Sequence, residues 1–291
     1  MTLRGPVLVG TDLSPAAGEA LRQGARLARD LGSALLVCHV VPELIPDGSV
    51  FTEFRRANLD VQLSVVAKAR GAVQQHVDAV LGADHAAVDI LLESGTPHVG
   101  LLTQADETRA GVIVAGPGST GLDVVRHATT PVLIARPSPR GPVVGATDFS
   151  DHSLPALHAA AAEARRRGSD LHLLHAFDAG LFMLGRAPAA AMPYQADRSS
   201  IALEGLDHLQ SLAKQRLDLT LREHGLAGAT AVVAGSARNV IVQYAESVRA
   251  ELVVVGTHGR SGLARLTLGS TAASVIESAP CAVLVVRLGG S

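Results

Sequence analysis

The chain consists of two halves that repeat one another, and this repetition limits the possible folds more than any other feature. Matching segments keep the same order in both halves of the 291 residues. The matching pairs are Val9–Ser14 with Gly145–Ser150, Leu31–Val40 with Arg167–Ala176, Val112–Gly116 with Leu252–Gly256, and Gly118–Arg136 with Gly269–Arg287. Proline and glycine punctuate the chain between the halves, around 138–142. We therefore expect two homologous domains, residues 1–138 and 139–291.

Each half alternates short apolar runs with segments of helical periodicity. The strands expected in the first half are Val7–Gly10, Ala34–Val41, Val88–Leu92, Val112–Ala115 and Val132–Ala135. Continuous apolar strands that alternate with helices are typical of a parallel sheet covered on both faces. The sequence thus predicts two doubly wound, Rossmann-like α/β domains in tandem. Ligands of such folds bind beyond the carboxyl ends of the strands.

A glycine-rich loop follows the fourth expected strand of the second half. It covers Gly256–Thr271 and reads GTHGRSGLARLTLGST. Glycine adopts backbone conformations that other residues resist, and it has no side chain to keep a ligand away. Ser270 is expected to cap the helix that follows, whose free N–H groups and dipole favour an anion. The loop is therefore either a phosphate cradle or a surface turn that merely needs glycine.

The spacing of these glycines resembles the nucleotide-binding signature of the universal stress protein family. Two residues separate Gly256 from Gly259, and nine separate Gly259 from the pair Gly269-Ser270. The resemblance extends over nearly the whole chain and implies a fold like that of the adenine-nucleotide alpha hydrolases, with ATP, with or without Mg²⁺, as the ligand. The phosphate contacts that it implies are Gly256, Gly259, Arg260, Gly262, Gly269, Ser270 and Thr271. Arg260 suits bidentate contact with phosphate, and a solvated loop arginine is the alternative.

The same resemblance places the adenosine at the ends of the first two strands of the second half. The contacts that it implies there are Ala146, Thr147 and Asp148 for the adenosine end and Ala176 for the adenine. From the residues alone, Asp148 can equally be a helix cap. His39 and His175, at the ends of equivalent strands, are expected to be hydrogen-bonded structural residues. The reason is that no second histidine or carboxylate stands nearby at metal-ligand spacing.

The first half lacks the glycine loop. One residue, Pro117, stands between Gly116 and Gly118, where the second half has the twelve residues 257–268. We therefore expect nucleotide mainly in the second half and a degenerate site in the first. The glycines from Gly116 to Gly121 also satisfy the dinucleotide-binding fingerprint. They follow the fourth strand instead of the first, however, and no acidic residue stands at the required distance.

Charge and composition argue against several other classes of function. The formal net charge is −2, so the basic patch of a nucleic-acid-binding protein is not expected. Lys68 and Lys214 are the only lysines and lie away from any glycine loop, which argues against a P-loop. Two cysteines make no disulfide framework. Neither a signal peptide nor an apolar run long enough to span a membrane is visible, so we expect a cytoplasmic protein without a membrane partner.

Three functions are compatible with these features. The first is an ATP-binding module for regulation or stress response. The second is a nucleotide-free interaction scaffold that dimerises through its last edge strands, and the third is a nucleotide-transferring enzyme. No general base or other reactive constellation is visible beside the glycine loop. We therefore assign no catalytic residue and no metal ligand, and expect at most slow ATP hydrolysis.

The last apolar strand of each half, 130–136 and 281–287, is expected to be an edge strand with unpaired backbone groups. Universal stress proteins pair such strands across a two-fold axis, so the resemblance implies an intramolecular pseudo-dimer of the two halves. A homodimer is also compatible with the sequence. The long loop 178–198 could cover the site or contact another subunit.

Overall fold

The computed structural model describes residues 3–42, 52–82, 85–177, 198–257 and 268–287; within the helices, the side chains of 52–63 and 198–206 are not described. The chain forms two compact units. The N-terminal unit comprises Thr2–Pro137 and Ala282–Val285, and the C-terminal unit comprises Ser138–Cys281 and Val286–Gly290.

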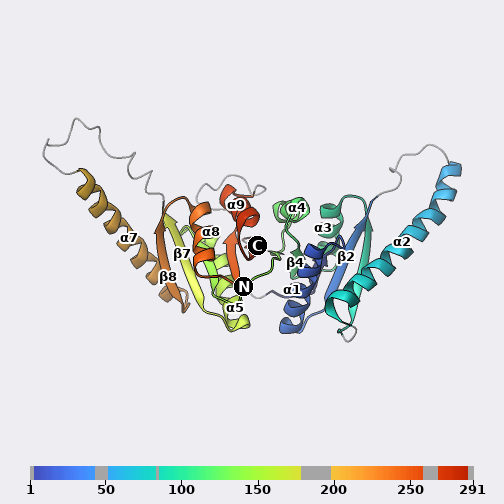
Figure 1. Cartoon of the computed structure of the whole chain (residues 1–291), viewed down its shortest axis with the longest axis horizontal. Coiled ribbons are helices and arrows are strands. Elements are labelled where there is room, and N and C mark those ends of the chain that lie inside the picture. Colours follow the sequence, from blue (N-terminus) through green and yellow to red (C-terminus); the bar gives the residue numbers. More distant parts are fainter. Residues whose placement is uncertain (1–2, 43–51, 83–84, 178–197, 258–267, 288–291) are drawn as a thin grey trace. The chain divides into compact units, whose positions relative to one another are not determined.

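The N-terminal unit is a sheet in the order β3-β2-β1-β4-β5-β10, with helices packed against it (Figure 1). Strands β1 to β5 are parallel, and β10 runs antiparallel to β5. The strands are β1 (Val7–Gly10), β2 (Leu35–Val41), β3 (Val88–Ser94), β4 (Val112–Ala115), β5 (Val132–Ile134) and β10 (Ala282–Val286). The helices are α1 (Pro15–Leu31), α2 (Thr52–Leu81), α3 (Pro97–Glu107) and α4 (Ser119–His127).

The C-terminal unit repeats this plan with four parallel strands in the order β9-β6-β7-β8. The strands are β6 (Val143–Thr147), β7 (Leu171–Phe177), β8 (Ala229–Ala234) and β9 (Leu252–Gly256). The helices are the 3₁₀ turn η1 (Asp151–Ser153), α5 (Leu154–Arg167), α7 (Arg198–Glu223), α8 (Ala237–Ser247) and α9 (Ser270–Ser278). Both units are therefore mainly parallel α/β sheets, as the alternation of apolar runs and helices predicts.

The central strands are buried because their residues are apolar on both faces of the sheet. Val7, Leu8 and Val9 of β1 have no exposed surface, and neither do Val143 and Val144 of β6. With only 2% aromatic residues in the chain, both cores consist mainly of aliphatic side chains and alanine.

Helix α1 shows how the sequence sets the ends of an element. The Ser14 side chain accepts a hydrogen bond from the Ala17 N–H at 3.2 Å, and Pro15 occupies the first helical position. Gly32 ends the helix in the left-handed conformation, with φ 61°. Serine caps, early prolines and terminal glycines are common at helix ends, so the local sequence accounts for both ends of this helix.

Strand β10 belongs to the second repeat in sequence and packs in the N-terminal unit. It pairs with β5 so that Leu284 lies opposite Leu133. Strand β5 therefore has β4 on one side and β10 on the other, and its backbone groups are paired on both sides. The last strands of the two repeats thus pair with each other, which is the arrangement expected for a tandem chain.

Candidate functional site

A cavity of about 310 Å³ lies at the carboxyl ends of β6, β7 and β9, next to the first turns of α8 and α9. We call it the C-terminal crevice. Eight of the site residues predicted from the sequence line it: Ala146, Thr147, Asp148, Ala176, Gly256, Gly269, Ser270 and Thr271. The other three, Gly259, Arg260 and Gly262, lie outside the described residues, as do His258 and all of the predicted loop 178–198 except Arg198. Residues more than 120 positions apart in the sequence therefore meet in one cavity.

The Asp148 carboxylate is held in a tight turn at the end of β6. Its Oδ1 accepts hydrogen bonds from the Ser150 N–H at 3.0 Å and from the Ser150 hydroxyl at 2.6 Å. The next residue, Phe149, has φ 64°, a conformation that disfavours residues other than glycine. A hydrogen bond of 3.0 Å from the Phe149 N–H to Thr147 Oγ1 stabilises this turn. Asp148 therefore stabilises a turn and lines the crevice. It is not a helix cap, because Ser150 is the N-cap of η1 and Ser153 is the N-cap of α5.

His175 joins the ends of β6 and β7. Its Nδ1–H donates to the Thr147 carbonyl oxygen at 2.8 Å, and its ring packs 4.1 Å from the Phe149 ring. His39 makes the same 2.8 Å bond to the Thr11 carbonyl in the N-terminal unit. The described residues contain no cluster of three or more side chains that could hold a metal ion. Because the Nδ1–H of each ring donates to the carbonyl at the end of the neighbouring strand, both histidines help to align the strand ends.

The first turn of α9 lines the C-terminal crevice. Ser270 is the first helical residue, and Gly269 is the N-cap, with φ −61° and no side-chain cap. The prediction that Ser270 is the cap is therefore wrong by one position, because the helix begins one residue earlier than its hydroxyl suggested. Uncapped N–H groups at a helix start need another partner, and an anion can supply it.

A hydrogen bond closes the base of the glycine loop. The Gly269 N–H donates to the Thr257 carbonyl oxygen at 2.9 Å, and the Thr257 N–H donates to the Val286 carbonyl oxygen at 3.2 Å. Thr257 is only 4% exposed, so this base is part of the core. Thr257 and Gly269, which flank the residues between β9 and α9, are therefore neighbours, and both line the C-terminal crevice. We call residues 257–268 the arm.

An apolar wall of the crevice was not predicted from the sequence. Leu174 of β7, Ile241 of α8 and Val255 of β9 line it, and Ile241 is only 4% exposed. Ala237 lies one helical turn before Ile241 on α8 and also lines the cavity. The sequence could have indicated this wall, because Ala237 and Ile241 are apolar, four residues apart, and follow the glycine after β8. This wall can bury the flat apolar part of a ligand.

The N-terminal unit has an equivalent cavity of about 250 Å³, which we call the N-terminal crevice. It lies at the ends of β1, β2 and β4, beside the start of α4. Gly116, Pro117 and Gly118 connect β4 to α4, and Gly118 has φ 133°. Only glycine adopts this conformation readily, so the short connection depends on it. The first repeat therefore lacks the arm, as its sequence predicts, and nevertheless keeps a cavity.

Two ionisable side chains line the N-terminal crevice with shifted pKa values. Partial burial raises the pKa of Asp12, but hydrogen bonds from Ser14 and the charge of His39 outweigh this and hold the pKa below its ordinary value. Burial, and then the charge of Glu93, raises the pKa of Cys38 to about 12. At neutral pH the carboxyl is therefore charged, and the thiol is protonated and unreactive.

Comparison with known proteins shows the family of this chain. The model of the universal stress protein family matches residues 4–136 and, a second time, residues 140–287. The chain belongs to the universal stress protein family. It is 30% identical to a universal stress protein of Mycobacterium tuberculosis strain H37Rv over 310 residues, which cover 97% of this chain and 95% of the relative. A universal stress protein of Methanocaldococcus jannaschii is 32% identical over 145 residues, or 50% of this chain and 81% of the relative.

A solved structure shows the same fold over the whole chain. The crystal structure of a universal stress protein from Archaeoglobus fulgidus superposes with a TM-score of 0.65 at 18% sequence identity, and 99% of each chain is covered. A structure of another Archaeoglobus fulgidus universal stress protein in complex with dAMP covers 45% of this chain and 97% of that one, with 25% identity and a TM-score of 0.33. This universal stress protein thus has two family domains in tandem. Within its described ranges, no helix is long and apolar enough to cross a membrane.

Proposed function

We propose that this universal stress protein binds ATP in its C-terminal crevice and acts as a regulatory module in a stress response. The observation that carries the proposal is that Asp148, Ala176 and the start of α9 line one cavity. These are the positions that the signature resemblance assigns to ribose, adenine and phosphate. The glycine loop with that signature starts and ends at the same cavity.

The energetics require all three parts of the crevice. Binding with a micromolar Kd needs about 8 kcal/mol. The start of α9 supplies about 0.3–2 kcal/mol through its dipole. Burying the adenine against Leu174 and Ile241 contributes at about 25 cal/mol per Å² of apolar surface. The remainder would come from N–H groups of the arm and from Asp148.

The crevice supports binding better than catalysis. Asp148 is the only acidic or basic side chain among the described residues that line it. Its Oδ1 already accepts two hydrogen bonds from Ser150, and its position at the end of β6 suits contact with the ribose. With no metal-ligand cluster in the described residues, Mg²⁺ would be held mainly by the phosphates of ATP. We propose at most slow hydrolysis.

The scaffold alternative relies on the last strand of each repeat, β5 and β10, and these two strands pair with each other. Strand β5 is paired on both sides within the N-terminal unit, so its edge is not available to a second copy. A homodimer would have to use a surface other than β5. A cytoplasmic location remains part of the proposal, because ATP is supplied there.

The direct test is to denature the purified full chain after incubation with Mg·ATP and gel filtration, and to identify released nucleotides by mass spectrometry. We expect about one ATP or ADP per chain. If no ATP or ADP is recovered, and calorimetry with Mg·ATP shows no heat of binding, the proposed function is wrong.

A further inference from the structure

The N-terminal crevice keeps the features that would bind a nucleoside. Asp12 stands at the end of β1 as Asp148 does at the end of β6, and each accepts a hydrogen bond of 3.0 Å from the serine two residues on. Leu101 of α3, only 3% exposed, lines this cavity as Ile241 lines the other. A Cβ atom on Gly10 would come within 2.8 Å of Leu101, so the glycine lets this apolar wall approach. An ionised carboxylate and an apolar wall thus remain.

The phosphate end of the N-terminal crevice is much reduced. Helix α4 starts after Gly118 without a side-chain cap, so the N–H groups of its first turn can meet an anion. Pro117 has no N–H group to donate, and it replaces a twelve-residue arm that contains Arg260 and Arg265 in the second repeat. The described residues lining this cavity include no lysine or arginine.

Charge then limits the number of phosphates. A helix start is equivalent to about half a positive charge, and one terminal phosphate carries about −1.5 to −2 at pH 7. A second and a third phosphate would add negative charge with no lysine or arginine among the described lining residues to offset it, in a cavity that already holds the Asp12 carboxylate. One phosphate at the start of α4 is therefore the most that this crevice can hold favourably.

We propose that the N-terminal crevice is a second ligand site, which binds a nucleoside carrying no more than one phosphate. AMP is the adenine nucleotide that fits this description. The class of base rests on the proposed function, since it is inferred from the equivalent crevice of the second repeat. One chain would then hold ATP and AMP in separate crevices, and its state of occupancy would follow the ratio of the two nucleotides.

The test is equilibrium dialysis of the full chain with labelled AMP in the presence of saturating Mg·ATP. We expect one AMP per chain that ATP does not displace. Asp12→Asn keeps an oxygen for the turn but removes the charge that would bind the ribose hydroxyls, and we expect it to weaken AMP binding about 10- to 100-fold. Asp123→Asn is the matched control, because Asp123 lies in the same unit on α4, pairs with Arg126 and does not line the crevice.

Other outcomes separate this proposal from the proposed function. If ATP binds and displaces all AMP from a single site, or if Asp12→Asn binds AMP as wild type does, the second site does not exist. If inorganic phosphate displaces AMP and adenosine does not, the site recognises phosphate and not a nucleoside, which also overturns the proposal. Binding of AMP that depends on Asp12, in a chain that binds no ATP, would support the second site and refute the proposed function.

Discussion

At the residue scale, Asp148 is the charged group on which recognition of the ligand would depend. Asp148→Asn keeps the oxygen that accepts from Ser150 and removes the charge that, in the proposed complex, would strengthen hydrogen bonds to the ribose. A hydrogen bond to a charged group contributes about 1.5–3 kcal/mol, so we expect ATP affinity to fall about 10- to 100-fold. Isothermal titration calorimetry would measure this.

The control for that substitution is Asp151→Asn. Asp151 is exposed in η1, three residues away, and does not line the crevice. Its replacement should leave the Kd for ATP within twofold of wild type, about 0.4 kcal/mol. An Asp148→Asn chain that binds ATP as tightly as the Asp151→Asn chain would contradict the role of Asp148.

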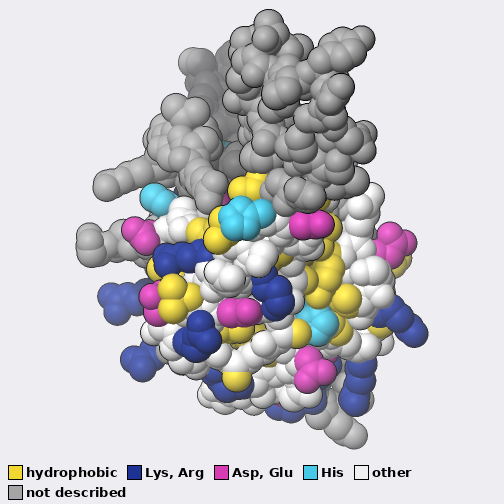
Figure 2. All heavy atoms as spheres, turned by 90° about the vertical axis from the view of Figure 1, so that its left-hand side faces the viewer, with side chains coloured by type: hydrophobic (Ala, Val, Ile, Leu, Met, Phe, Trp, Pro, Cys, Tyr) yellow, Lys and Arg dark blue, Asp and Glu magenta, His cyan; other side chains and the backbone are white. Residues whose placement is uncertain are grey.

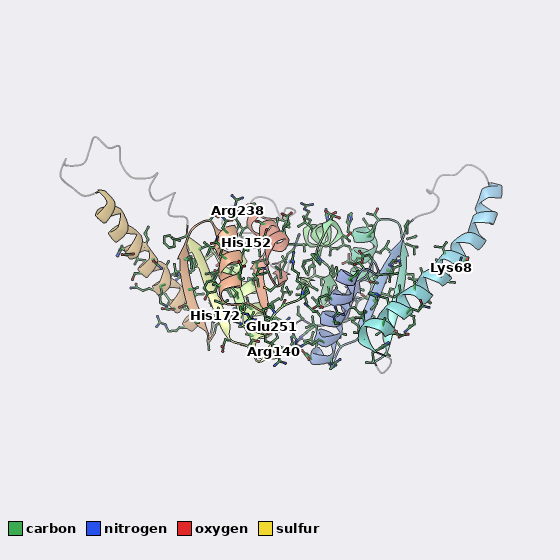
Figure 3. All side chains as sticks on the ribbon, in the orientation of Figure 1. Lys68, Arg140, His152, His172, Arg238 and Glu251 are labelled. Atoms are coloured by element: carbon green, nitrogen blue, oxygen red, sulfur yellow. The ribbon has the colours of Figure 1, made fainter. Side chains whose placement is uncertain are left out.

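His175 gives a second prediction at this scale, on stability. His175→Ala leaves the buried Thr147 carbonyl without the 2.8 Å hydrogen bond, and the loss should lower the free energy of unfolding by about 1–3 kcal/mol. Urea unfolding followed by circular dichroism checks this. His152→Ala, at an exposed position labelled in Figure 3, should change the same quantity by less than about 0.5 kcal/mol. Equal effects of the two substitutions would refute the structural role.

At the scale of elements, the short β4–α4 connection depends on one glycine. Gly118 has φ 133°, and a Cβ atom there would meet nothing within 4 Å, so the effect of a side chain is on the backbone alone. We expect Gly118→Ala to destabilise the fold by about 1–3 kcal/mol. Gly71, at an exposed position of α2, also has open space, and Gly71→Ala should instead stabilise by about 0.5–1 kcal/mol. Thermal unfolding of both variants tests the contrast of sign.

A buried ionic network joins α5 to the start of β9. Arg167 donates to Glu163 at 3.0 Å and to Glu251 at 2.6 Å, and Arg166 donates to Glu163 at 2.6 Å. All four side chains are 8–12% exposed. Figure 3 shows Glu251 at the opposite end of the C-terminal unit from Arg238, whose helix α8 lines the crevice. The network therefore stabilises the unit away from the proposed ligand.

This network makes stability depend on pH. Burial raises the pKa of Glu163, but the hydrogen bond and charge of Arg166 and the charge of Arg167 outweigh it and hold the pKa below the ordinary 4.5. A carboxyl with a depressed folded-state pKa stabilises fully above its unfolded value, and this contribution is lost as the pH falls through the folded-state pKa. Wild-type stability should therefore decrease below about pH 4.5.

Substitution of Glu163 tests that dependence. Glu163→Gln leaves two buried arginines short of a partner and should cost about 3–5 kcal/mol at neutral pH. Its stability should also fall less steeply than that of wild type when urea unfolding is repeated at decreasing pH. Glu19→Gln removes a surface pair with Arg22 and should cost less than about 1 kcal/mol. Parallel pH profiles for Glu163→Gln and wild type would show that Glu163 does not cause the dependence.

At the scale of the whole molecule, the last strand of the chain determines whether β5 is covered. A chain that ends at Pro280 lacks β10 and leaves the backbone groups of β5 unpaired on one side. Exposed strand edges promote association, so we expect this truncated chain to aggregate, as measured by size-exclusion chromatography with light scattering. A chain that ends at Arg287 keeps β10 and should elute as wild type does. A soluble, unchanged Pro280 truncation would refute the importance of this pairing.

Surface charge at this scale matches the small net charge of the chain. Figure 2 shows the face of the C-terminal unit on which α7 lies, where basic and acidic side chains are interspersed. On the described part of that face, the basic side chains form no single large patch.

Local patterns in the sequence were enough to predict much of the fold and part of the candidate site. Two parallel α/β domains follow from the alternation of apolar runs and helices, and the position of the crevice follows from the rule that parallel strands present their carboxyl ends at one edge. The glycine spacing of 256–270 and the missing arm at Pro117 are also read directly from the residues. Such features are predictable because each depends on neighbours within one or two elements.

Tertiary packing alone decided the rest. The apolar wall from Ile241, the bond from His175 to the Thr147 carbonyl and the contact of Arg167 with Glu251, 84 residues away, join segments that no local pattern links. Packing also leaves a cavity in the N-terminal unit after the arm is lost, because strand ends and Leu101 form it independently of the arm. The physical reason is that periodicity determines which face of an element is buried, whereas the neighbours that meet there depend on how the elements pack together.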